Sequence, residues 1–271
     1  ELGLVTGMTG DGVNDSPALK KADVSFAMGS GTEVSKEASD IVIIDDNILS
    51  ISKAILYGRT TFKNIRKFII FQLTVNISAI MLALIGPFIG VPSPITVLQM
   101  LWINMVMDTL AGLAFSYEVP RIEYMKELPK KKEENIINRY MFNEIISSSI
   151  YTLTISLLFL KLPFIKYIIS DNHLMTSFFS LFIFIAVFNS FNARTHRLNI
   201  LAHLKENKVF ILIIIFIIIV QISIIYSGIT LFQTKPLYIK ELIFILILSL
   251  GIIPFDFLRK YISKKLRGDF G

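Results

Sequence analysis

Hydrophobic residues follow two different patterns in this chain, and the change between them falls near Phe68. Before Phe68, short apolar runs alternate with polar stretches that contain Gly, Asp and Ser. From Phe68 onward, apolar runs of about twenty residues recur between polar loops. A helix of that length matches a hydrocarbon layer of roughly 30 Å. The pattern therefore predicts a partial α/β domain followed by an all-α transmembrane bundle.

Residues 1–49 predict the later part of a parallel sheet. The strand candidates are Leu4–Met8, Val24–Met28 and Ile41–Ile44. Pro17–Lys21 and Thr32–Ala38 fit short helices between them, because proline favours the first helical turn and threonine is a good N-cap. Strands that alternate with helices are typical of parallel sheets.

Residues 50–67 predict a basic cytoplasmic stalk helix that runs without a breaker into the first membrane span. The predicted spans cover residues 68–85, 96–115, 142–160, 175–191, 209–226 and 239–258, and a basic cytoplasmic tail covers 259–271. Lys and Arg concentrate in the loop after the second span, the loop after the fourth span and the tail. Because such loops stay in the cytoplasm, both termini are expected there.

Composition narrows the function classes. With 53% hydrophobic residues and a mean hydropathy of +0.63, the chain is no ordinary soluble enzyme. The net charge of +6 comes from residues beside the apolar runs, so we expect a lipid bilayer as partner and no nucleic acid. Without cysteine, disulfides and thiolate metal sites are excluded. Usage rich in Ile, Lys and Asn suggests an AT-rich genome, hence a bacterial cytoplasmic membrane.

The stretch Met8–Leu19 carries the candidate chemistry of the α/β part. It places Asp11, Asn14 and Asp15, with Gly10 and Gly12, just after the first predicted strand. Ligands bind at the carboxyl ends of parallel strands, and glycines let the backbone approach a phosphate. Carboxylate oxygens suit Mg²⁺. The residues favour a Mg²⁺-dependent phosphoryl-transfer site, although a Gly-Asp-Gly turn followed by a helix cap would have the same local sequence.

Three polar residues lie deep in the first two spans: Asn76, Asn104 and Asp108. Burying such groups in lipid is costly, which makes them candidates for an ion site. Asn104 and Asp108 are four apart and should share a helix face. One carboxylate and two amides supply hard oxygen ligands suited to Ca²⁺, although each Asn could instead bond a neighbouring helix. Tyr117-Glu118 is interpreted as boundary chemistry at the end of the second span.

The Met8–Leu19 string resembles the hinge motif of P-type ATPases. The neighbouring strings Ala22–Val24, Ala27–Gly29 and Lys36–Asp40 match as well. The resemblance implies a haloacid-dehalogenase-like fold, with Asp11 as a Mg²⁺ ligand and Asn14 and Asp15 orienting the phosphoryl group. ATP would be the substrate, bound mainly by a domain outside this sequence. Since no Asp-Lys-Thr-Gly-Thr motif occurs, we expect a carboxyl-terminal fragment whose partner is the amino-terminal half of the same pump.

The strings Gln72–Asn76 and Gln99–Thr109 look like the fifth and sixth helices of plasma-membrane-type calcium pumps. Two-site calcium pumps have oxygen ligands where this chain has Ala79, Met107 and Ala186. The resemblance implies one Ca²⁺ site, made by Asn76, Asn104, Asp108 and a further helix. Alternatives are a P-type pump for Na⁺, H⁺ or Mg²⁺, an ion-binding membrane protein with no ATPase role, and a phosphatase domain fused to an unrelated anchor.

Overall fold

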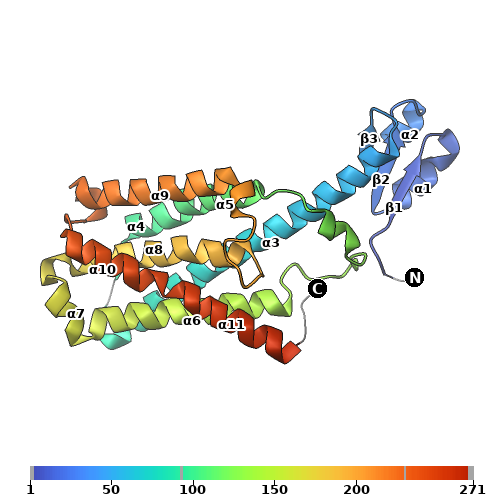
Figure 1. Ribbon diagram of the computed structural model, residues 1–271. Helices are drawn as coiled ribbons and strands as arrows, with labels where there is room; N and C mark the ends of the chain where they lie inside the picture. The colour runs from blue at the N-terminus through green and yellow to red at the C-terminus, as the bar shows by residue number, and fades with distance from the viewer. Residues whose placement is uncertain (1–2, 92–93, 229, 268–271) are drawn as a thin grey trace. The chain divides into compact units, whose positions relative to one another are not determined.

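The computed structural model describes residues 3–91, 94–228 and 230–267 (Figure 1). These residues form two compact units. The first combines Glu1–Lys63 with Pro120–Ile136, and the second combines Asn64–Val119 with Ile137–Gly271. The loop after the second span therefore belongs, by its contacts, with the amino-terminal part of the chain.

The first unit contains a parallel sheet in the order β1 (Gly7–Gly10), β2 (Val24–Met28) and β3 (Ile41–Ile43). The parallel arrangement is as predicted, but the first strand begins later than expected. Leu4 makes only an isolated antiparallel bridge to Lys131, because the backbone here pairs with the loop of the same unit. The strand also extends two residues beyond the predicted end at Met8, to Gly10, and so ends directly before Asp11.

Two short helices connect the strands, and the expected capping residues are in place. Helix α1 (Ser16–Lys21) follows a 3₁₀ turn, η1 (Val13–Asp15), and has proline in its first turn. The Thr32 hydroxyl caps α2 (Glu33–Glu37) by accepting from the Ser35 amide at 3.3 Å. A small core of Phe26, Ile43 and Ile51 supports the sheet.

Helix α3 runs continuously over Ile48–Ile85, which confirms one long helix. In the first unit it meets the 120–136 loop, which contains η4 (Ile122–Lys126). Arg59 Nη1 donates to the carbonyl oxygens of Tyr124 and Glu127 at 2.6 and 2.9 Å. Lys63 pairs with Glu127 and lies over the Tyr124 ring. Backbone and charge contacts thus fix this lysine-rich loop against α3.

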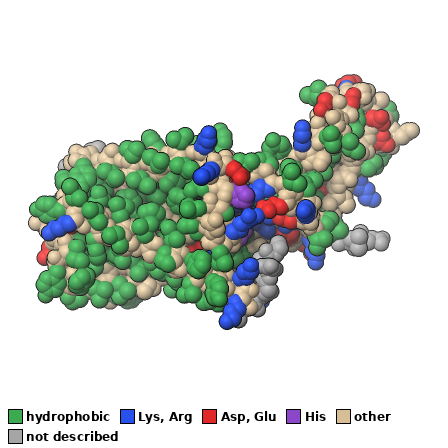
Figure 2. Space-filling view, in the orientation of Figure 1, with side chains coloured by type: hydrophobic (Ala, Val, Ile, Leu, Met, Phe, Trp, Pro, Cys, Tyr) green, Lys and Arg blue, Asp and Glu red, His purple; other side chains and the backbone are tan. Residues whose placement is uncertain are grey.

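The second unit is helical, and six of its helical segments are long and apolar enough to cross a membrane. Their bounds are Ile48–Ile89, Val97–Ser116, Arg139–Lys161, Asp171–Arg194, Lys208–Tyr226 and Ile239–Lys265. On the face seen in Figure 2, hydrophobic side chains cover the helices of this unit, and several Lys and Arg side chains gather toward one end. The expectation of an α/β part followed by six apolar helices is confirmed.

Helix α8 (Leu174–Arg194) lies at the centre of this bundle. It contacts α6 (Arg139–Lys161), α9 (Lys208–Tyr226), α10 (Ile239–Leu250) and α11 (Ile252–Arg267) (Figure 1). In the span that includes this helix, 78% of the most apolar 18-residue stretch is buried inside the protein. The remaining short elements are η2 (Gly86–Ile89), α7 (Pro163–Ile168), η5 (Asp171–His173), η6 (Leu204–Glu206) and η7 (Thr230–Phe232).

Two of the spans are not single regular helices. The second consists of α4 (Val97–Leu101), a π-helical segment (Trp102–Met107) and α5 (Asp108–Ser116). The sixth changes from α10 to α11 at Gly251, just before Pro254, whose ring cannot continue the hydrogen-bond ladder. Helical π segments are rare and often occur at functional sites. The π segment therefore makes the residues around Asp108 candidates for a functional site.

Candidate functional site

The loop after β1 holds the predicted phosphoryl-transfer residues. Asp15 Oδ2 accepts the backbone N–H groups of Asp11 and Gly12 at 3.1 and 3.0 Å. The Asp11 carbonyl is fixed in turn by the Ser35 hydroxyl at 3.0 Å and the Thr32 amide at 2.8 Å. Asp15 thus closes the loop and positions Asp11, so one of its oxygens is already engaged.

The Asp11 carboxylate and the Asn14 amide are exposed. Among the described residues, neither side chain has a recorded hydrogen bond or ion pair. A free carboxylate and a free amide at the carboxyl end of a parallel strand fit the oxygen ligands that Mg²⁺ prefers. The residue types present at this edge of the sheet are therefore compatible with a hydrated Mg²⁺.

Glycine at position 10 is required by this loop. A Cβ added to Gly10 would lie 2.5 Å from Asp15 Cβ, a distance that real side chains do not reach. At Gly12 an added Cβ would meet Asp15 Oδ2 at 3.5 Å, an ordinary contact. The two glycines of the motif therefore have different roles, and only Gly10 is sterically necessary.

Asp108 occupies the junction between the π segment and α5. Asp108 is 4% exposed. Among the described residues, neither carboxylate oxygen has a hydrogen-bond partner of good geometry, and the group nearest to forming one is the Gln72 side chain on α3. A buried carboxylate without a cationic partner is costly unless it is protonated or binds a cation.

The two asparagines lie differently from Asp108. Asn76 on α3 is half-buried, and Asn104 in the π segment is exposed. Asn104 and Asp108 therefore do not share a buried face, because the wide π turn alters the angle between them. Within the described ranges, no recorded hydrogen bond joins the three predicted ligands. The described side chains also include no group of three or more His, Asp or Glu that could hold a metal.

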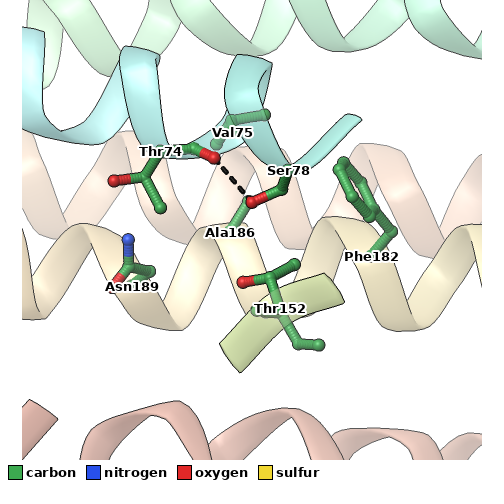
Figure 3. A pocket seen from close by; sticks show the side chains of 8 residues that line it. Thr74, Val75, Ser78, Thr152, Phe182, Ala186 and Asn189 are labelled. Carbon is green, nitrogen blue, oxygen red and sulfur yellow. Dashed lines mark hydrogen bonds between the residues drawn. The ribbon is translucent and has the colours of Figure 1, made fainter. Parts of the chain in front are cut away.

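A small cavity lies between α3, α6 and α8, next to the turn that carries Asn76 (Figure 3). Its volume of about 10 Å³ has room for a single water. The polar groups that line it are neutral: Thr74, Ser78, Thr152 and Asn189. Ala186 also lines it, so no carboxylate faces this space. The cavity can hold water, and its lining offers no charge to balance a divalent cation.

Two family descriptions match the chain. "Cation transporting ATPase, C-terminus" matches residues 92–262, which is more than half of the sequence. "Haloacid dehalogenase-like hydrolase" matches residues 6–55, which include the three-stranded sheet. The chain belongs to the cation-transporting ATPase family. Its α/β part is haloacid-dehalogenase-like, as the hinge motif implied.

Several curated proteins are similar to this chain over most of its length. "Calcium-transporting ATPase 2" of Schizosaccharomyces pombe is 38% identical over 98% of the chain. "Plasma membrane calcium-transporting ATPase mca-1" of Caenorhabditis elegans is 39% identical over 92% of the chain, and the human "Plasma membrane calcium-transporting ATPase 1" is 38% identical over 92%. The chain spans about a fifth of the length of these relatives, 22%, 21% and 22% respectively.

The expectation of an integral, multi-pass membrane protein is confirmed by the six apolar helices and the family match. The relatives named above come from a yeast, a worm and a mammal. Because these relatives are all eukaryotic, they do not support the bacterial source inferred from residue usage.

One polar residue of this chain was misjudged from the sequence. Glu118 is 5% exposed and lies inside a cluster of charged and amide side chains, so it is no simple boundary residue. Burial alone would raise the pKa of Glu118, but the charges of Lys67 and Arg194 outweigh it and lower the pKa. The signal available in the sequence was the presence of a basic residue, Lys67 or Arg194, at the corresponding end of two other spans.

Proposed function

We propose that this chain is the carboxyl-terminal part of an ATP-driven calcium pump that works through an aspartyl-phosphate cycle. Identity of 38–39% with calcium-transporting ATPases over nearly the whole chain is the observation that carries the proposal. The buried Asp108 carboxylate beside a π segment adds support from the structure. Both termini are assigned to the cytoplasm.

The α/β part would hold Mg²⁺ through Asp11, with Asn14 and Asp15 orienting the phosphoryl group and Gly10 and Gly12 shaping the loop. When bound, Mg²⁺ neutralises phosphoryl charge. ATP would bind mainly to a domain outside this sequence. In this assignment Asp15 acts through the backbone of the loop, because its Oδ2 accepts two amide N–H groups there.

Calcium is the proposed cargo, at one site made by Asn76, Asn104 and Asp108 together with a helix outside this sequence. Exposure of Asn104 and partial exposure of Asn76 are compatible with ligands that face another helix. The neutral lining of the cavity near Asn76, with Ala186 in place of an acidic side chain, supports a single site. Continuous helix α3 would carry motion from the phosphorylated domain to Asn76.

A chimera tests the proposal. The chain replaces the matching segment of the Schizosaccharomyces pombe calcium-transporting ATPase 2, and ATP-driven uptake of radioactive calcium into vesicles is measured. We expect uptake with the wild-type chain, none with Asp108→Asn, and normal uptake with the control Asp171→Asn, whose exposed carboxylate lies at the start of the short turn η5. ATP hydrolysis stimulated by Na⁺, H⁺ or Mg²⁺ but not by calcium would favour another pump. No cation-stimulated hydrolysis would contradict the proposal.

A further inference from the structure

The Glu118 carboxylate connects three other helices of the bundle. Its Oε1 accepts from Arg194 Nη1 at 3.3 Å and from Asn207 Nδ2 at 3.1 Å. Its Oε2 pairs with Lys67 Nζ at 3.3 Å. These partners come from α8, the N-cap of α9 and α3, while Glu118 itself follows α5. A carboxylate has about four acceptor positions, so one side chain can hold all three.

The partners of Glu118 are themselves fixed. Arg194 Nη2 donates to the carbonyl oxygens of Ile200 and Ala202 at 2.9 and 2.7 Å. Asn207 caps α9 by accepting from the Phe210 amide, and its Nδ2 also donates to the Ala114 carbonyl on α5. The side chains of Glu118, Lys67 and Arg194 are 3%, 8% and 0% exposed. The cluster is therefore a buried, interlocked junction.

The cluster lies where α3 and α5 pack together. The Phe71 and Phe115 rings are 5.8 Å apart between centroids. A Cβ added to Gly112 would meet the Phe68 ring at 3.3 Å, so the Phe68 side chain packs directly against the α5 backbone there. A shift of one helix along the other would break these contacts and the Lys67–Glu118 pair together.

The spacing on the two helices is matched. Nine residues separate Lys67 from Asn76, and ten separate Glu118 from Asp108. At a rise of about 1.5 Å per residue, Asn76 lies roughly 14 Å along α3 from Lys67, and Asp108 lies roughly 12 Å from the end of α5, which Glu118 follows. Locking Lys67 to Glu118 thus fixes the relative depth of Asn76 and Asp108.

We propose that Glu118 is a positioning residue, which holds α3 and α5 in the register that the cation site requires without touching the cation. This inference rests on the proposed function. A role in stability alone is the competing explanation, since removing one partner of a buried ion pair is strongly destabilising in general. The two explanations differ in what happens to calcium affinity and to the α3–α5 register.

The register can be measured on the chain alone, because it contains no cysteine. The double variant Phe71→Cys/Phe115→Cys is expressed in membranes, and disulfide formation with copper phenanthroline is followed over time. Adding Glu118→Gln should slow the reaction about tenfold, because Lys67 and Arg194 lose their shared anion. Glu133→Gln, at an exposed loop carboxylate, is the matched control and should leave the rate unchanged.

Calcium uptake by the chimera gives the second readout. Glu118→Gln should raise the calcium concentration for half-maximal uptake about tenfold, within the usual range of coupling between sites, and change the maximal rate much less. Glu118→Asp, which keeps the charge, should recover part of the affinity. An unchanged half-maximal concentration, or a loss of maximal rate and melting temperature alone, would refute positioning. If the wild-type chimera transports no calcium, the proposed function fails. An unchanged cross-linking rate in Glu118→Gln would separately refute the claim that Glu118 holds the register of α3 and α5.

Discussion

Substituting Gly10 by alanine should disable the loop that carries Asp11. The new Cβ would lie 2.5 Å from Asp15 Cβ, whereas an ordinary contact begins near 3.4 Å. Because Asp15 Cβ is attached directly to the backbone, side-chain rotation cannot relieve the clash. The loop must therefore move by about 1 Å, and the two hydrogen bonds that Asp15 accepts from it must lengthen.

The expected loss follows from this displacement. A misplacement of about 1 Å in a catalytic group can lower a rate about 100-fold. The two strained hydrogen bonds, each worth about 1 kcal/mol, add a smaller loss of local stability. We expect Gly10→Ala in the chimera to form phosphoenzyme from labelled ATP about 100-fold more slowly, with calcium and Mg²⁺ both present.

Gly12→Ala is the matched control. Its φ of −102° is open to alanine, and its added Cβ makes an ordinary 3.5 Å contact. It should change the rate only about twofold, as surface substitutions usually do. Equal losses in the two variants, or a normal rate in Gly10→Ala, would refute the steric argument.

Three further predictions concern the helices. Inserting two glycines beside Lys63 in the chimera should leave ATP hydrolysis but abolish coupled calcium uptake, and retained coupling would contradict a stiff α3. Lys260→Met should lower the melting temperature by roughly 5–10 °C, because buried Lys260 pairs with Asp256 at 2.7 Å; exposed Lys265→Met should not, as followed by fluorescence of the single tryptophan. At the cavity wall, Ala186→Leu should lower the melting temperature by overpacking the cavity, while Ala186→Ser should leave it nearly unchanged. A lower melting temperature for Ala186→Ser than for Ala186→Leu would refute the small cavity volume.

Much of the fold was predictable because its signals are local. Alternating apolar runs gave the three strands, and Pro17 and Thr32 marked helix starts that the structure confirms. Length and hydropathy alone gave six spans. The first strand was misplaced because Leu4 pairs with Lys131, a partner far away in the sequence.

The candidate sites were only partly predictable. The sequence identified Asp11 and Asp108 as unusual, and their roles remain predictions. It did not reveal that the Asp15 carboxylate accepts backbone N–H groups of its own loop, since those hydrogen bonds depend on the turn geometry. No residue type marks a π segment, so the different burial of Asn104 and Asp108 was not foreseen. The burial of Glu118 depends on Lys67, Arg194 and Asn207, which no local pattern connects.

The sheet of the first unit has β1 and β3 at its two edges, as far as the described residues extend. An edge strand presents backbone N–H and C=O groups that can pair with a strand from another molecule. Detergent covers the apolar spans but not these groups. Purified preparations of the 271-residue chain are therefore at risk of self-association through the sheet, and a soluble strand-like peptide or a fused α/β partner would be a better remedy than more detergent.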